Sequence, residues 1–178
     1  MTNERLIVVV GNVCDATSVN GIVKGHDVVI SAAGPGVAIA NDSNQAPIVV
    51  QAANALVAGL KQAGVRRLIV VGGAGSLEVV PGVQLVDTPD FPDQYRPTSL
   101  AHRESLKIFQ GSDLDWTFFS PAADFEPGER TGTFRIGTTQ LLVDAAGKSR
   151  ISVEDFAIAL LNEDENSQFI RRQMTAAY

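Results

Sequence analysis

The chain has 178 residues, of which 45% are hydrophobic and 19% charged, so it fits one domain with a single core and is not a disordered chain. Its net charge of -6 argues against nucleic-acid binding, because phosphate contacts require clustered Lys and Arg. No apolar run approaches the roughly 20 residues of a membrane-spanning helix, and one cysteine excludes an intrachain disulfide, so we expect a cytoplasmic protein with no membrane partner.

Short β-branched runs alternate with helical patterns in the first half of the chain, as they do in parallel βαβ units. The continuous apolar run at residues 6–10 predicts a strand covered on both faces. Asp15 can cap a short helix, and residues 27–33 predict a second strand. Residues 47–64 then predict a long helix, because apolar residues recur there at intervals of three and four.

The second half continues this alternation. Further short strands are predicted at residues 67–71, 116–120, 133–136, 140–143 and 173–178, the last as an edge strand. The proline-rich stretch 80–97 predicts a surface excursion, and residues 98–110 predict a helix. Ser152 begins a capping-box pattern that opens the last helix.

Several sequence blocks follow one another in an order typical of one known group. They are GNVCD, HDVVISAAGPG, RRLIVVGGAGSLEV, LVDTPDFPDQY, SDLDWTFFSPAADFEPGERTG, LLVDAAGKSRISVEDFAIAL and QMTAAY. The chain resembles the atypical short-chain dehydrogenase/reductase group, which includes NmrA-like and biliverdin-reductase-B-like proteins, and is most similar to its NADH-flavin reductase type. The resemblance implies an α/β fold, with residues 1–178 forming one NAD(P)-binding domain around a Rossmann-like, doubly wound, mostly parallel sheet.

The same resemblance places residues 6–10 at the third strand of the family fold. We therefore expect an N-terminally truncated fold without the first strand, the glycine-rich phosphate-binding turn, the first helix and the second strand. The family strand order 3-2-1-4-5-6 would put the two absent strands between residues 6–10 and 27–33. Either residues 6–10 move across to pair with residues 27–33, which we favour, or an apolar edge stays exposed and invites a homo-oligomer.

The resemblance assigns the cofactor, NAD or NADP, to three places along the chain. The implied contacts are Asn12 and Val13 beside the adenine, Ala32, Ala33 and Gly34 beside the ribose and nicotinamide, and Gly73, Ser120, Pro121 and Ala122 after the next two strands. Two alternatives stay open, because Asn12 could be only a turn residue and residues 32–34 only a βα turn. The residue that separates NAD from NADP lies in the absent segment.

Ser76 and His102 are the candidate catalytic residues. Ser76 resembles the serine that orients the substrate, whereas Thr98 and His102 stand where related enzymes carry the tyrosine and lysine of a proton-donating pair. Carbonyl reduction by that pair is therefore not expected, although His102 could shuttle a proton, contact a ribose or be a plain helix residue. Tyr95 and Phe125 are candidates for the substrate pocket, with core packing as the alternative for Phe125. The spacing of acidic residues and histidines predicts no metal site.

The resemblance implies an NAD(P)H-dependent oxidoreductase that transfers hydride to a small-molecule acceptor, either a flavin or a quinone-like compound. Two other functions remain open. The chain could be a dinucleotide-binding sensor or partner protein without chemistry, as in the NmrA-like branch. It could also be a truncated product that binds the cofactor weakly or not at all, since the lost backbone contacts to the pyrophosphate are each worth roughly 1.5–3 kcal/mol.

Overall fold

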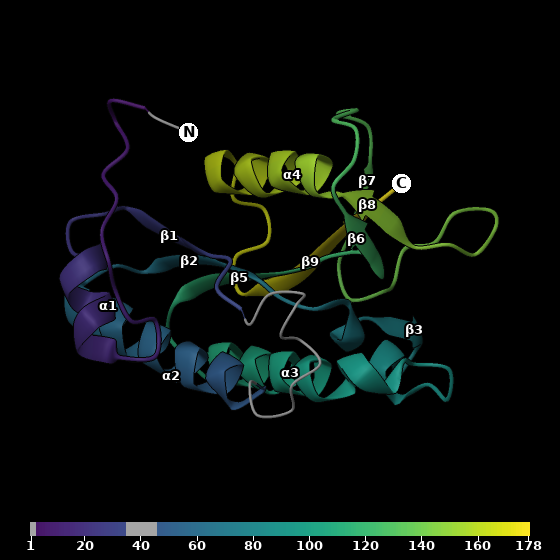
Figure 1. Ribbon diagram of the computed structural model, residues 1–178, viewed down its shortest axis with the longest axis horizontal. Coiled ribbons are helices and arrows are strands. Elements are labelled where there is room, and N and C mark those ends of the chain that lie inside the picture. The colour runs from purple at the N-terminus through teal and green to yellow at the C-terminus, as the bar shows by residue number, and fades with distance from the viewer. Residues whose placement is uncertain (1–2, 35–45) are drawn as a thin grey trace.

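A computed structural model describes residues 3–34 and 46–178 of the chain. A five-stranded sheet forms its centre, with helices packed on both of its faces (Figure 1). The strands lie in the order β1 (Val28–Ser31), β2 (Arg67–Val71), β5 (Asp115–Ser120), β9 (Arg172–Ala177) and β7 (Arg135–Gly137). All neighbours are parallel except β7, which runs antiparallel to β9. The predicted α/β class with a mostly parallel sheet is confirmed.

Within the described residues, four α-helices cover the sheet. They are α1 (Ala16–Val23), α2 (Ala46–Ala63) and α3 (Arg96–Gln110) on one face and α4 (Val153–Glu165) on the other. Asp15 and Ser152 cap α1 and α4 as predicted, because each side chain accepts a backbone N–H bond of the first turn. Among these described residues, no helix is long and apolar enough to cross a membrane.

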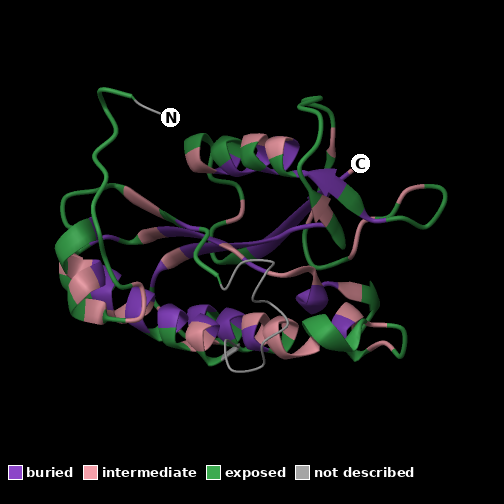
Figure 2. Cartoon of the chain, viewed as in Figure 1, coloured by how far each residue is buried: buried purple, intermediate pink, exposed green. Residues whose placement is uncertain are grey.

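Alternate side chains of β5 point into two separate hydrophobic cores. Phe118 packs on the side of α1, α2 and α3, with Phe109 of α3 among its neighbours. Phe119 points to the opposite face and stacks on Phe156 of α4, with ring centroids 3.9 Å apart. Figure 2 shows the buried residues gathered in the sheet and on the helix faces turned toward it. Because successive side chains of a strand point to opposite faces, β5 contributes to the hydrophobic cores on both faces of the sheet.

Three predictions about strands are wrong. Residues 6–10 form no strand and do not pair with residues 27–33, because the extended chain there makes no ladder with β1. Residues 140–143 contribute only an isolated bridge between Gln140 and Glu78, because the segment beside them pairs with them at this one residue and forms no ladder. The last strand, β9, is not at an edge, because β5 and β7 pair with its two sides.

Two small sheets were not expected. The proline-rich excursion contains the hairpin β3 (Glu78–Val80) and β4 (Val83–Gln84), followed by short 3₁₀ helices at Leu85–Asp87 and Asp93–Tyr95. Beyond β5, β6 (Asp124–Glu126) pairs in parallel with β8 (Arg150–Ser152) beside the start of α4. This second pair gives the molecule a lobe at the carboxyl end of the main sheet.

Candidate functional site

The carboxyl ends of three neighbouring parallel strands meet at one edge of the sheet. The register aligns Ser31 of β1 with Val70 of β2, and Val71 of β2 with Phe119 of β5. The segments 32–34, 72–76 and 120–122 therefore emerge side by side, although they are far apart in the sequence. Open α/β sheets bind ligands outside such strand ends.

The three segments differ in what they offer to a ligand. Ala32, Ala33 and Gly34 are exposed, and Gly73 is half-buried. A set of three residues after β5 lies beneath the surface, namely Ser120, Pro121 and Ala122. Ligand contact in this conformation is therefore available from the ends of β1 and β2, while the turn after β5 supports them from below.

Ser76 takes part in a buried hydrogen-bond network at this edge. Its hydroxyl lies 3.1 Å from the Gly73 carbonyl, to which it donates, and 3.3 Å from the Ser120 hydroxyl. The side-chain amide of Gln173 on β9 donates to both serine oxygens at 2.9 Å. Ser76 is 2% exposed, so its hydroxyl joins strand ends and does not face a ligand in this conformation.

Sequence reasoning missed Gln173. It stands in a strand that otherwise carries Met174, Ala176 and Ala177 in the core, so an amide at this position was a signal that a buried polar partner exists. The partners themselves come from two distant strands and could not be read from the sequence.

His102 lies next to the Gly73 backbone. A Cβ built on Gly73 would lie 3.4 Å from carbons of the imidazole, so the glycine leaves room for the ring. Desolvation by burial lowers the pKa of His102 to about 4, and the ring is therefore neutral at pH 7. Its Nδ1 atom is buried, with no hydrogen-bond partner among the described residues. Thr98, which the resemblance aligned with the family tyrosine, lies one helical turn earlier on α3.

Four other candidates lie in different surroundings. The Asn12 side-chain oxygen accepts the Cys14 backbone N–H, so Asn12 acts as a turn residue before α1. Val13 packs against the core on the side of α1 and α2. Tyr95 is an exposed residue directly before α3, and Phe125 packs on Phe156 with ring centroids 4.9 Å apart. The structure does not bring Tyr95 and Phe125 into one pocket.

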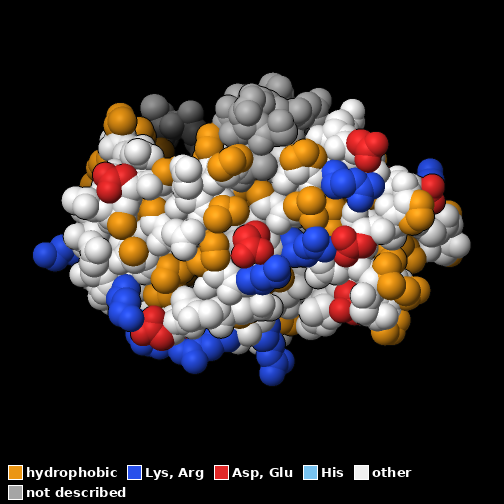
Figure 3. All heavy atoms as spheres, turned by 90° about the horizontal axis from the view of Figure 1, so that it is seen from below, with side chains coloured by type: hydrophobic (Ala, Val, Ile, Leu, Met, Phe, Trp, Pro, Cys, Tyr) orange, Lys and Arg blue, Asp and Glu red, His pale blue; other side chains and the backbone are white. Residues whose placement is uncertain are grey.

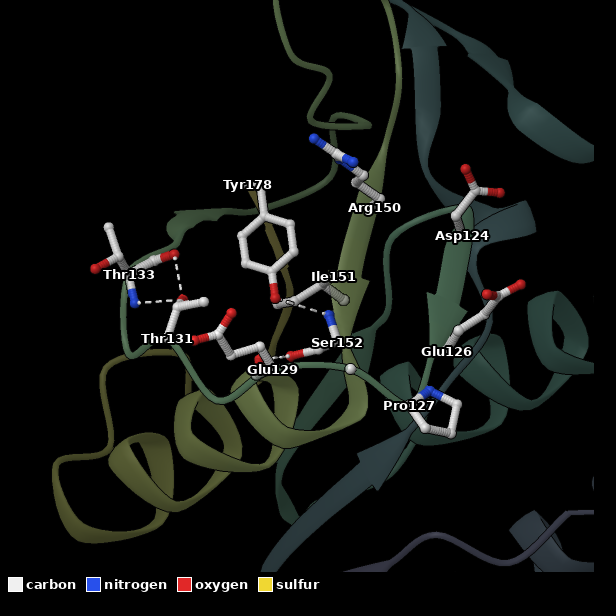
Figure 4. Close-up of a pocket in the computed structure, with 11 residues that line it drawn as sticks. Asp124, Glu126, Pro127, Glu129, Thr131, Thr133, Arg150, Ile151, Ser152 and Tyr178 are labelled. Carbon is white, nitrogen blue, oxygen red and sulfur yellow. Dashed lines mark hydrogen bonds between the residues drawn. The ribbon is translucent and has the colours of Figure 1, made fainter.

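A cavity of about 800 Å³ lies in the lobe formed by β6 and β8 (Figure 4). Its lining includes three carboxylates and one guanidinium, from Asp124, Glu126, Glu129 and Arg150. Phe125 points away from it because side chains alternate along β6. The cavity begins only two residues after Ala122, and thus adjoins the predicted site along the chain. Sequence reasoning missed it because its strands are short and pair only with each other.

A buried carboxylate holds the rim of this cavity in place. Asp155, in the first turn of α4, accepts hydrogen bonds from the Thr131 hydroxyl at 2.6 Å, the Gly132 backbone at 2.8 Å and the Tyr178 hydroxyl at 2.9 Å. Burial alone would raise the pKa of Asp155, but these hydrogen bonds outweigh it and hold the pKa below its ordinary value. The loop 127–133 is thereby fixed to the start of α4.

Basic side chains around the helix layer are engaged by acidic ones. Arg103 of α3 forms an ion pair with Asp87 at 2.8 Å, and Arg96 pairs with Asp93 at 3.2 Å while donating to the Phe91 carbonyl. Figure 3 shows basic and acidic side chains interspersed on this face. In the described part of the chain, no group of three or more His, Cys, Asp or Glu residues could hold a metal ion.

A model of the NAD(P)H-binding family matches residues 1–164. The chain belongs to this family. Its curated relative YwnB from Bacillus subtilis, whose role is uncharacterised, is 43% identical over 159 residues, covering 86% of this chain and 71% of YwnB. The expected membership of the atypical short-chain dehydrogenase/reductase group is thus confirmed, with a Rossmann-like sheet.

Two solved structures are closely similar. A "putative exported protein" from Burkholderia pseudomallei is 51% identical with a TM-score of 0.85, covering 94% of this chain and 79% of its own. A "putative NADH-flavin reductase" from Streptococcus pneumoniae is 32% identical with a TM-score of 0.79, covering 89% and 74%. Together with the family match, these similarities identify the chain as a dinucleotide-binding, oxidoreductase-like protein.

Proposed function

We propose that this chain is an NAD(P)H-dependent reductase that transfers hydride to a flavin or a quinone-like acceptor in the cytoplasm. One observation carries the proposal: the ends of β1, β2 and β5 lie side by side in a chain of the NAD(P)H-binding family. The similarity to a protein named as an NADH-flavin reductase supports the choice of acceptor.

The residues present fit the nicotinamide half of the cofactor. Ala32, Ala33 and Gly34 carry small or absent side chains, so their backbone can approach a ribose and a ring closely. The phosphate half is less well served, because Arg96 and Arg103 are already paired with acids. Binding would therefore rest on backbone contacts and be weak.

His102 defines the kind of chemistry that this edge supports. A neutral imidazole with a pKa of about 4 is a poor proton donor at pH 7, and Thr98 is a poorer one than tyrosine. NAD(P)H would supply one hydride, and the flavin would take one further proton from water, so no protein acid is required. In this proposal, His102 and Gly73 shape the edge and exclude water from it.

The cavity beside β6 and β8 is our candidate for the acceptor. Its volume of about 800 Å³ lies within the range of small-molecule pockets, roughly 300–1,000 Å³. Three carboxylates against one guanidinium disfavour a phosphate group, because like charges repel. We therefore expect riboflavin to be a better acceptor than FMN.

The test combines binding with turnover. NADH and NADPH are titrated by fluorescence, and oxidation is then followed with riboflavin or FMN. Ala33→Glu places a negative charge at the proposed dinucleotide site, and Ala145→Glu makes the same change at an exposed turn. We expect Ala33→Glu to weaken binding by about 10-fold or more, roughly the effect of 1.4 kcal/mol, with Ala145→Glu unchanged. Equal effects of the two substitutions would refute the assigned edge.

The same experiment decides the second candidate function. The Ser76 hydroxyl is bonded inside the protein, and this observation favours a dinucleotide-binding sensor without chemistry. Tight binding without oxidation by either acceptor would support the sensor. Dissociation constants above a millimolar for both dinucleotides would instead indicate that this chain does not function through the cofactor.

A further inference from the structure

The cavity beside β6 and β8 offers a ligand an uneven set of hydrogen-bonding groups. All of its lining residues lie between 124 and 178, and three of them are the carboxylates Asp124, Glu126 and Glu129. These three residues are exposed, and no ion pair with another described residue engages them. An ionised carboxylate accepts hydrogen bonds and donates none, so this part of the lining consists of hydrogen-bond acceptors.

The loop 127–133, which forms one wall of the cavity, directs backbone donors toward α4. The Gly128 N–H donates to the Glu154 carboxylate at 2.8 Å. The Gly132 N–H donates to the Asp155 carboxylate, also at 2.8 Å. These N–H groups are therefore not available to a ligand, whereas the carbonyl oxygens of the wall can still accept hydrogen bonds.

Three hydroxyl groups of the lining are engaged in the same way. The Thr131 hydroxyl donates to Asp155 at 2.6 Å, and the Thr131 backbone N–H donates to the same oxygen at 3.2 Å. The Tyr178 hydroxyl also donates to Asp155, at 2.9 Å. The Ser152 hydroxyl donates to the Glu129 carbonyl at 2.9 Å (Figure 4). Because a hydroxyl carries a single hydrogen, each of these groups can offer a ligand only its lone pairs.

Asp155 receives most of these hydrogens, although it does not itself line the cavity. It is fully buried in the first turn of α4 and accepts from two hydroxyls and two backbone N–H groups. A buried carboxylate requires such donors, so they stay turned toward it. Two side-chain donors of the lining make no hydrogen bond to a described residue, namely the Thr133 hydroxyl and the Arg150 guanidinium. The cavity is therefore rich in hydrogen-bond acceptors and poor in donors.

We propose that this cavity selects an electron acceptor that itself donates hydrogen bonds, and that Asp155 is the positioning residue responsible. The inference rests on the proposed function, which makes the cavity the site of the electron acceptor. An oxidised flavin carries a ring N–H group, and riboflavin adds the hydroxyls of its side chain. A simple quinone such as menadione has only carbonyl oxygens, which would face further hydrogen-bond acceptors here. Of the two classes of electron acceptor, flavins therefore match this lining and quinones do not.

The first test measures binding in the absence of dinucleotide. Riboflavin, lumiflavin and 3-methyllumiflavin are titrated with the full chain by flavin fluorescence, and menadione is measured by competition with riboflavin. Lumiflavin lacks the side-chain hydroxyls, and 3-methyllumiflavin also lacks the ring N–H. One neutral hydrogen bond corresponds to about 2- to 10-fold in affinity, so affinity should fall at each step and menadione should bind at least about 10-fold more weakly than riboflavin. Equal affinities within either pair, lumiflavin with 3-methyllumiflavin or riboflavin with menadione, would overturn the proposal, as would no binding of riboflavin.

The second test changes Asp155 to Asn. An amide has one acceptor oxygen instead of two and cannot hold all four donors, so the Thr131 and Tyr178 hydroxyls become available to a ligand. The ratio of the menadione to the riboflavin dissociation constant should then fall by about 3-fold or more. Asp164→Asn, the same change at a half-buried residue of α4, should leave this ratio unchanged. Lower stability alone would weaken both ligands equally, so an unchanged ratio in Asp155→Asn would overturn the role of Asp155.

Thr131→Val provides the second variant should Asp155→Asn fail to fold, because Thr131 is exposed. Its hydroxyl hydrogen is directed to Asp155, so the substitution removes only a hydrogen-bond acceptor from the cavity and should weaken riboflavin more than menadione. The opposite order would overturn the proposal. Both tests measure binding and not turnover. Riboflavin that binds as expected but does not oxidise NADH would therefore count against the proposed reductase and not against the selectivity of this cavity.

Discussion

Glu163 is the residue whose loss should most weaken the fold. Its carboxylate, 2% exposed, accepts hydrogen bonds from Arg67 at 2.7 Å, Thr117 at 3.0 Å and the backbone of Gln168 and Phe169 at 2.9 and 3.1 Å. The ion pair thus joins α4 and the segment before β9 to the starts of β2 and β5. Glu163→Gln keeps the shape but leaves the Arg67 charge, 14% exposed, without its counter-ion.

Removing one partner of a buried ion pair costs about 3–5 kcal/mol, because the other charge stays desolvated. At roughly 2–4 °C for each kcal/mol in a domain of this size, the melting temperature should fall by about 6–20 °C. Urea unfolding can be followed by the fluorescence of Trp116, the one tryptophan, which is buried on β5.

Glu165→Gln is the matched control, because Glu165 is exposed two residues later on α4. Its effect should stay within about 0.5 kcal/mol. If Glu163→Gln were no less stable than Glu165→Gln, the ion pair would not hold these elements together and the reasoning would be refuted.

Three further predictions concern acid stability, close packing and the imidazole. The folded pKa of Asp155 is lowered, so its contribution to stability is complete above the ordinary pKa of about 3.9 and is lost as pH falls through the folded pKa. The difference in unfolding free energy between wild type and Asp155→Asn should therefore narrow in acid. A difference that does not change with pH would contradict this. Gly72→Ala should destabilise the fold by about 1–3 kcal/mol, because its Cβ would lie 2.1 Å from the Phe118 ring. Gly111→Ala is the control and should leave the stability unchanged, because the nearest atom to its Cβ would be 3.6 Å away. Equal urea midpoints for the two variants would refute the close contact at Gly72. The NMR signal of the His102 ring should stay that of the neutral form down to about pH 5. Folding stability should fall as pH drops from 6.5 to about 4, because the unfolded chain takes up a proton that the folded chain does not. An NMR titration midpoint above pH 6 for His102 would disprove its burial.

Local signals in the sequence predicted most of the elements correctly. The side chains of Asp15 and Ser152 cap helices because their oxygens fit the free N–H groups of a first turn, and this depends only on neighbours in the sequence. The strand at Arg67–Val71 has the predicted bounds, since its apolar run is bracketed by turns. The family blocks assigned residues 32–34, Gly73 and residues 120–122 to one cofactor site; this assignment stays a prediction, although the ends of β1, β2 and β5 do lie side by side.

The errors share a physical cause, which is that a strand exists only through its partner. Residues 6–10 have the composition of a buried strand, yet no neighbour lies beside them to form a ladder. β6 and β8 carry Asp124, Glu126 and Arg150, which do not look like strand residues, and they pair across more than twenty residues of chain. Gln173 was missed for the same reason, since both of its serine partners are distant in sequence.

The position of β9 in the sheet has a consequence for how the protein emerges from the ribosome. β7 is synthesised before β9, yet β9 is the one strand among the described residues that pairs with it in the sheet, with Ile136 opposite Ala176. During synthesis, β1, β2 and β5 can already pair with one another. β7 and the free side of β5 stay unpaired until β9, residues 172–177, has left the exit tunnel of the ribosome. Non-local pairing of this kind is slow and leaves apolar surface open. A pause in translation before β9 would therefore lengthen the time for which this apolar surface stays open.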